Sequence, residues 1–173
     1  MDTPHDDPPL QPRLPTLADL CDLGRRLKAT SAKYVLVGGW AMAQLGATWP
    51  TAPIELLVDT SPDNFERVKT AMLGLPDGAI REVQQGDLDQ FVVVRVGDEF
   101  VVDLMKSACG IEFAEAVKHT VVINVAGVPI RFANPRLLWR MKQTHREKDA
   151  LDRQFLRELL KGDLPPNPDA RTS

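Results

Sequence analysis

Short apolar runs alternate with helical patterns along most of this chain, and this alternation constrains the fold more than any single motif. Segments with the composition and length of strands or strand pairs lie at 33–39, 53–59, 89–106 and 121–133. The two longer segments turn in the middle, at 97–99 and at Gly127, and we expect each to be a hairpin. Helical patterns fill the intervals, at 17–30, 40–46, 61–75, 110–120 and 134–160.

This order predicts an α/β (α+β) fold in which a mixed β-sheet is flanked by helices. The helix starts agree with it, because Thr16, Ser61 and Asn134 are residue types that cap helices. Proline follows the second and third of these caps, at the first helical position. The segment 134–160 is expected to be a long C-terminal helix, or two helices.

The chain divides into one folded unit and two tails. Its 173 residues suffice for one domain with a core. The ends are rich in proline and aspartate, so we expect disordered tails at 1–15 and 162–173 and one domain at 16–161.

The composition excludes several classes of protein. A net charge of −3 excludes a uniformly basic nucleic-acid binder, although residues 136–157 contain seven Lys and Arg. The apolar runs are too short to span a bilayer, and the N-terminus has no secretion signal. The two cysteines form no CxxC motif. We therefore expect a cytoplasmic protein with reduced thiols and no membrane partner.

Three features of the strands could carry chemistry. Gly38-Gly39 ends an apolar strand and opens a helix, an arrangement that can bind an anion or can be only a tight turn. Glu55 and Asp103 each lie within an otherwise apolar strand, where a carboxylate is costly to bury unless it is paired or binds a metal. A shared site for a hard cation such as Mg²⁺ is one interpretation. The alternatives are an acid at the exposed start of its strand and an acid on an edge strand.

The C-terminal segment carries a row of charges. Lys142, Arg146, Asp149 and Arg153 recur at spacings of four, three and four, which predicts one face of a continuous helix. Such a row could hold a triphosphate or an RNA backbone. The alternative is a solvated face with internal ion pairs.

These elements and motifs together resemble the nucleotidyltransferase superfamily, which has the DNA polymerase β type of fold. The likeness covers about residues 17–160 and is strongest to the AbiEii-like group, which includes toxins of type IV toxin–antitoxin pairs. In that group a glycine pair and a short helix precede the string hG-x-x-R-x-T-x-D-I-D-L-L-V, which here runs LGATWPTAPIELLV. VVDLM matches the strand of the third acid, and FANPRLLWRMKQTHREKDALD matches the closing helix.

The resemblance implies a specific reaction. In that family three acids hold two Mg²⁺ ions, which bind an NTP and activate an acceptor hydroxyl, so that an NMP is transferred and pyrophosphate leaves. By position, Glu55 and Asp103 would be the remaining metal ligands and catalytic residues. The positions that would bind the nucleotide are Gly38, Gly39, Lys142 and Arg146. The implied partners are a nucleotide, an RNA or tRNA acceptor, and an antitoxin protein.

The chain departs from the family pattern at three positions within seven residues. Pro53 stands where the first metal acid belongs and offers no side-chain ligand. Glu55 replaces the second acid, an aspartate, and is one methylene longer, while Trp49 replaces the arginine. We therefore expect a degenerate site that binds nucleotide, RNA or a protein partner, with weak or lost NMP transfer. The alternatives are an active Mg²⁺-dependent transferase and an α/β interaction domain without a nucleotide site.

Overall fold

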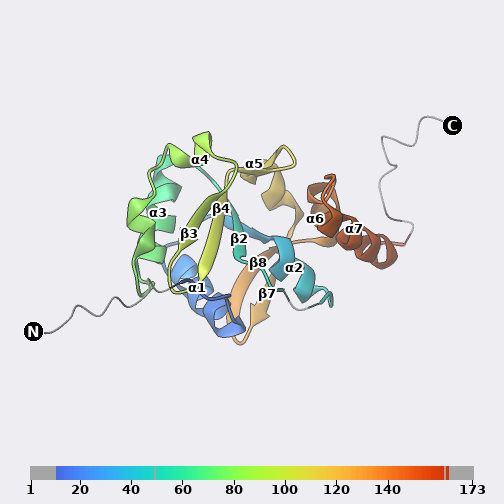
Figure 1. Ribbon diagram of the computed structural model, residues 1–173, viewed down its shortest axis with the longest axis horizontal. Helices are drawn as coiled ribbons and strands as arrows, with labels where there is room; N and C mark the ends of the chain where they lie inside the picture. The colour runs from blue at the N-terminus through green and yellow to red at the C-terminus, as the bar shows by residue number, and fades with distance from the viewer. Residues whose placement is uncertain (1–10, 49, 162, 164–173) are drawn as a thin grey trace, which may run out of the picture.

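A computed structural model describes residues 11–48, 50–161 and 163 of the chain (Figure 1). Within them, six strands form one sheet in the order β3-β4-β2-β1-β8-β7. The strands are β1 (Tyr34–Val37), β2 (Ile54–Val58), β3 (Val94–Gly97), β4 (Val101–Met105), β7 (Thr120–Val125) and β8 (Val128–Ala133). The pairs β1/β8 and β2/β4 are parallel and the others antiparallel, so the predicted mixed sheet is confirmed.

Helices lie before, between and after the strands, which gives the fold its α+β character, and most of them lie where the pattern predicts. The helix at 87–90 was not predicted, because residues 89 and 90 were expected to begin a strand. The helices are α1 (Leu17–Ala29), α2 (Gly38–Gln44), α3 (Pro62–Leu73), α4 (Asp87–Gln90), α5 (Phe113–Ala116), α6 (Pro135–Met141) and α7 (Glu147–Leu159). Short 3-10 turns lie at Ala79–Glu82 and Val117–His119, and a small hairpin joins β5 (Ser107–Ala108) to β6 (Ile111–Glu112). The caps at Thr16, Ser61 and Asn134 each accept a backbone N–H, as expected of these residue types.

The centre of the sheet is buried, which explains its uninterrupted apolar strands. All four residues of β1 are buried, and in β2 every residue except Glu55 is buried. Helices α1 and α3 pack together along the sheet, while α6 and α7 stand at the opposite end of the molecule (Figure 1). Glu55 is the second residue of β2 and follows the fully buried Ile54, so it is partly buried and does not lie at an exposed start of the strand.

The C-terminal segment forms two helices, and the expectation of one continuous charged face was wrong. Helix α6 ends at Met141 and α7 begins at Glu147, so Lys142 and Arg146 lie in the connection between them. The guanidinium of Arg153 donates to the carbonyl oxygens of Lys142 and Thr144, at 2.6 and 2.9 Å. The four charged residues are thus divided between the connection and α7, where Asp149 and Arg153 contact the connection, instead of forming one helical face.

Both predicted tails lie largely outside the described residues, as does Trp49. Of the segment 1–15, residues 11–15 are described, and Arg13 forms a parallel bridge with Phe100 beside the β3–β4 turn. Among the described helices, none combines the length and apolar character needed to cross a membrane.

Candidate functional site

Three charged residues form a row across adjacent strands. Glu55 of β2 is the register partner of Asp103 of β4, and Asp103 is the partner of Arg95 of β3. Residues paired in this way point to the same face, and neighbouring strands lie about 4.8 Å apart. The sheet therefore places the two acids predicted from the sequence side by side.

Arg95 holds the carboxylate of Asp103 with both ends of its guanidinium. Its Nε donates to Oδ1 at 2.9 Å and its NH2 to Oδ2 at 3.1 Å. The Asp103 side chain is only 6% exposed, whereas that of Arg95 is 66% exposed. The hydrogen bond and the charge of Asp103 raise the pKa of Arg95. A fixed cation thus sits on the acid that the family resemblance assigns to a metal.

The carboxylate of Glu55 lies on the glycine turn. A Cβ placed on Gly38, whose φ is +71°, would stand 1.5 Å from Oε2 of Glu55. The backbone of Gly39 also lowers the pKa of this carboxylate, although the effect of burial is larger. The turn expected to hold phosphate is therefore in contact with an anion of the chain itself, and the missing side chain at Gly38 makes room for it.

Burial raises the pKa of Glu55, and the charges around it act in both directions. The positive charges of Lys142 and Lys148 lower this pKa, whereas the negative charge of Asp103 raises it further. Burial has the largest effect, and the pKa stays above its ordinary value. Glu55 is the acid of this row that no Lys or Arg pairs directly within the described residues.

Lys142 is buried in an ion-pair cluster at the α6–α7 connection. Its Nζ lies 3.3 Å from Oδ1 of Asp149 and 2.8 Å from Oδ2 of Asp152. The other oxygen of Asp149 accepts hydrogen bonds from Thr144 and from Nε of Arg146. Although burial raises the pKa of Asp149, the Thr144 hydrogen bond and the nearby cations outweigh it, and the pKa is lowered. The amine expected to contact a triphosphate is thus shared by two carboxylates.

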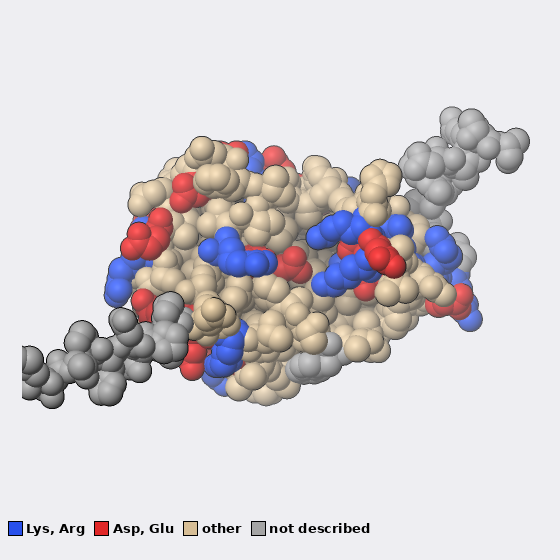
Figure 2. Space-filling view, viewed as in Figure 1, with Lys and Arg blue, Asp and Glu red and all other residues tan. Residues whose placement is uncertain are grey.

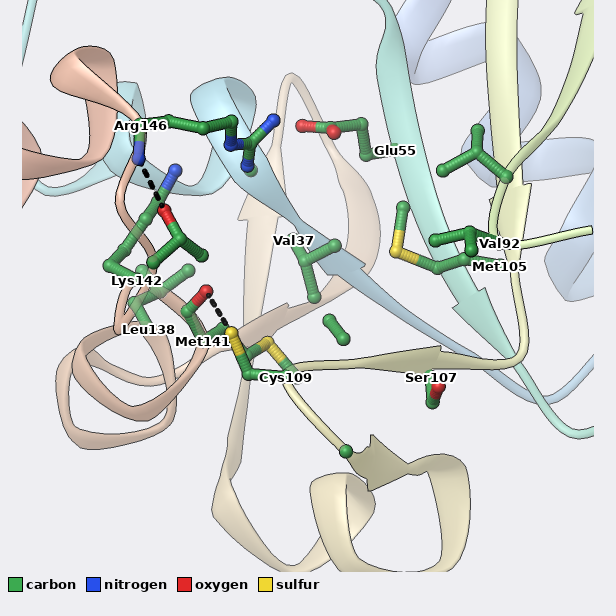
Figure 3. A pocket seen from close by; sticks show the side chains of 15 residues that line it. Val37, Glu55, Val92, Met105, Ser107, Cys109, Leu138, Met141, Lys142 and Arg146 are labelled. Atoms are coloured by element: carbon green, nitrogen blue, oxygen red, sulfur yellow. Dashed lines mark hydrogen bonds between the residues drawn. The ribbon is translucent and has the colours of Figure 1, made fainter.

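A cavity of about 410 Å³ lies between Glu55 and the α6–α7 connection (Figure 3). Gly38, Glu55, Lys142 and Arg146 all line it, so four of the six residues predicted from the sequence meet at one opening. In Figure 3 the side chains of Glu55 and Arg146 point towards one another across one end of the cavity. Its size falls within the range of about 300–1,000 Å³ that small-molecule pockets occupy. Gly39 and Asp103 do not line it.

The cavity has apolar walls and a charged rim. Met105 and Val92 stand on one side in Figure 3, and Leu138 and Met141 on the other. Figure 2 shows Lys and Arg side chains gathered over the middle of the sheet and over α6 and α7, with acidic side chains among them. Arg146 resembles Arg95 in that its side chain is largely exposed, at 73%, while the acid that it pairs with, Asp149, is fully buried.

The residues present do not supply the ligand set of a two-metal centre. Pro53 contributes no side-chain ligand, and both oxygens of Asp103 are held by Arg95. Two acids outside this row, Asp63 and Asp89, are paired with Arg67 and Lys106. No group of three or more His, Cys, Asp or Glu side chains suited to a metal occurs in the described part of the chain.

The sequence analysis missed Arg95, which proves central to this site. A β3–β4 hairpin whose turn is centred near residue 99 pairs Arg95 with Asp103. The expected turn at 97–99 is centred one residue earlier, which changes the register. The exposed apolar residues Phe91 and Val92 were also missed, because they were expected to belong to a strand that in fact starts at Val94.

Comparison with known proteins adds no family assignment: no protein-family model matches the chain, and no curated protein matches it either.

Proposed function

We propose that this protein has a nucleotidyltransferase-like architecture, binds a nucleotide in the cavity beside Glu55, and has lost metal-dependent NMP transfer. We also propose that the protein is cytoplasmic. The observation that supports the loss of NMP transfer is the bidentate pair between Arg95 and Asp103. A metal-binding carboxylate must direct its oxygens at the ion, and here a guanidinium takes both of them.

The surroundings of the pair support loss of transfer. A carboxylate is absent at Pro53, and Glu55 lies against Gly38 and Gly39, where a phosphate would otherwise approach the backbone. Arg95 supplies a permanent positive charge, so the charge of Asp103 is balanced without a metal ion. Transfer that depends on two ions loses several kcal/mol of charge stabilisation when one ion is not held, since metals act directly on the transferred phosphoryl group.

The cavity supports retention of nucleotide binding. A nucleotide combines an apolar-faced base with an anionic phosphate, and the cavity combines apolar walls with the exposed guanidinium group of Arg146. Asp149, the acid that pairs with Arg146, is fully buried, so the exposed part of this pair presents positive charge to an incoming ligand.

One observation favours an active enzyme as a second candidate. Glu55 and Asp103 are register partners on one face of the sheet, which is where a metal-dependent transferase would need two of its acids. In that case the protein would move an NMP to an RNA, a protein or a small molecule, as the toxin of a toxin–antitoxin pair does, with its activity held in check by an antitoxin partner.

A transfer assay separates the two candidates. The full chain is incubated with each of the four NTPs, labelled on the α-phosphate, together with Mg²⁺ and total RNA or cell lysate. We expect no label on RNA or protein. Label that appears with the wild type and disappears with Asp103→Asn would establish the active enzyme and overturn our proposal.

Binding is measured separately, by calorimetric titration of nucleotides in EDTA. We expect Arg146→Ala to weaken binding by about tenfold, which corresponds to one lost charged contact of about 1.4 kcal/mol. Arg67→Ala is the matched control, because Arg67 is also partly exposed and paired with an aspartate but lies on α3. Equal loss in both variants would show non-specific attraction and no site at the cavity.

A further inference from the structure

We propose that β7 pairs antiparallel with β7 of a second copy of this chain, so that two sheets join edge to edge in a dimer with two-fold symmetry. The contact lies in a different part of the molecule from the cavity beside Glu55 and does not depend on the proposed function. Strands β1 and β8 separate β7 from β2, and none of the residues that line that cavity belongs to β7.

The two edges of the six-stranded sheet differ in how they are protected. β3 forms one edge and carries the charged side chain of Arg95. The N-terminal segment contacts the turn from β3 to β4, where the N–H of Arg13 donates to the carbonyl oxygen of Glu99 at 3.0 Å. β7 forms the other edge, and in the described part of the chain it pairs only with β8 (Figure 1). The free side of such a strand presents backbone groups that another strand can bind.

β7 lacks the features with which proteins usually block an open edge. Its sequence, TVVINV, contains no charge and no proline, and five of its six residues are β-branched. Its register with β8 runs residue by residue, so no bulge interrupts the strand. The side chains of Val121 and Val122 are 39% and 50% exposed. An uncharged strand of this composition on an open edge favours association with another strand.

The turn between β7 and β8 determines which backbone groups of β7 point outwards. Ala126 and Gly127 have φ values of 49° and 83°, which is the pattern of a two-residue type I′ turn. The flanking residues Val125 and Val128 then form a hydrogen-bonded pair, and such pairs alternate along an antiparallel ladder. Three residues of β7 therefore direct their N–H and C=O groups away from β8: Thr120, Val122 and Asn124.

These outward residues are complementary to a second copy of themselves. When Val122 lies opposite the partner's Val122, an antiparallel register places Thr120 opposite the partner's Asn124, polar against polar. On the other face of the sheet Val121 lies opposite the partner's Ile123, apolar against apolar. The three outward pairs exchange about six backbone hydrogen bonds. A single two-fold axis beside Val122 generates the whole contact, so the assembly closes at two chains.

The charges around β7 favour the antiparallel arrangement. Lys118 and His119 precede the strand, and Glu115 contacts both. Antiparallel pairing places them beside the partner's uncharged β7–β8 turn, whereas parallel pairing would bring the two Lys118 side chains together. Arg131 of β8 lies close to the two-fold axis along the strands. Three strand spacings, about 14 Å, separate it from its counterpart, and this exceeds the screening length of about 8 Å at physiological salt.

Sedimentation velocity on the full chain, from low micromolar to millimolar concentration, tests the dimer. The mass should rise from that of one chain towards twice that value. Because one pair of short strands forms a small interface, we expect a dissociation constant on the order of 100 μM. Val122→Pro removes an outward N–H and leaves the hydrogen bonds to β8 in place, so it should weaken dimerisation by about tenfold or more.

A second variant keeps the test decisive if the proline variant does not fold. Val122→Lys places two like charges beside the axis and should also weaken dimerisation by about tenfold or more. Leu73→Lys is the matched control, because Leu73 is an exposed apolar residue on α3, and it should keep the dissociation constant of the wild type. Circular dichroism at low concentration establishes that each variant is folded.

Amide hydrogen exchange at two protein concentrations locates the contact. The amide groups of Thr120, Val122 and Asn124 should exchange more slowly at the higher concentration, while those that face β8 should not change. A chain that stays monomeric at millimolar concentration would overturn the proposal. A dimer that both Val122 variants leave intact, or fibres that grow without stopping at two chains, would also overturn it.

Discussion

The pair between Arg95 and Asp103 allows a worked prediction. In Arg95→Ala, a carboxylate whose side chain is 6% exposed loses two hydrogen bonds of 2.9 and 3.1 Å. Removing one partner of a fully buried ion pair costs about 3–5 kcal/mol, and hydrogen bonds to charged groups contribute about 1.5–3 kcal/mol. Because Arg95 itself is mostly exposed, water screens the pair, and we expect a loss of about 2 kcal/mol.

The measurement is urea denaturation at neutral pH, supported by thermal unfolding. A loss of about 2 kcal/mol corresponds to a fall in Tm of about 4–8 °C for a domain of this size. Arg67→Ala removes a partly exposed arginine from an exposed aspartate and is expected to change stability by less than about 0.5 kcal/mol. The double variant Arg95→Ala with Asp103→Asn should lose less than the sum of the single variants. Equal, small effects of Arg95→Ala and Arg67→Ala would refute the claim that Asp103 depends on Arg95 for its charge partner.

Three further variants test the neighbouring contacts. Gly38→Ala should lower the free energy of unfolding by about 2 kcal/mol or more, because the residue has a positive φ and its new Cβ would clash with Glu55. The control Gly46→Ala also has a positive φ but has open space around it, so it should lower the free energy of unfolding by only about 1–2 kcal/mol. Asp149→Asn should lose about 3 kcal/mol at neutral pH, because it removes a buried charge from Lys142, and an unchanged urea midpoint would contradict this. The raised pKa of Glu55 means that the native state binds its proton more tightly than the unfolded chain, so the wild type loses stability as the pH rises above about 4.5. Glu55→Gln cannot ionise and should therefore gain stability relative to the wild type over that range. Parallel profiles of stability against pH for the two proteins would contradict this.

The sheet could be predicted because its strands are short, apolar and clearly bounded. Buried strands such as β1 and β2 have no polar residue to confuse the pattern except Glu55, and their turns carry glycine or proline. The pattern could not locate the break between α6 and α7. Residues 142–146 contain no proline or glycine. The connection is stabilised by side chains of Asp149 and Arg153, whose contacts span five to eleven positions and are not part of helix propensity.

The sequence indicated several residues of the candidate site, but it indicated neither Arg95 nor how the charged residues pair. The sequence singled out Glu55, Asp103 and Lys142 because acids in apolar strands and basic residues in the closing helix match a known arrangement of motifs. It could not indicate that Arg95 and Asp149 hold two of them, because those contacts depend on the register of a hairpin and on a chain reversal. A change of one residue in a strand register moves a side chain to the opposite face, so such pairings require the structure.

The most direct test of the account is the effect of Mg²⁺ on nucleotide affinity. GTP is titrated into the full chain calorimetrically, once with Mg²⁺ in excess and once in EDTA. We predict dissociation constants that agree within about twofold, because Arg95 already occupies Asp103 and no metal bridge to the phosphates forms. An affinity that rises by about tenfold or more with Mg²⁺, corresponding to at least 1.4 kcal/mol, would show that the acids still bind the metal and would contradict the central claim.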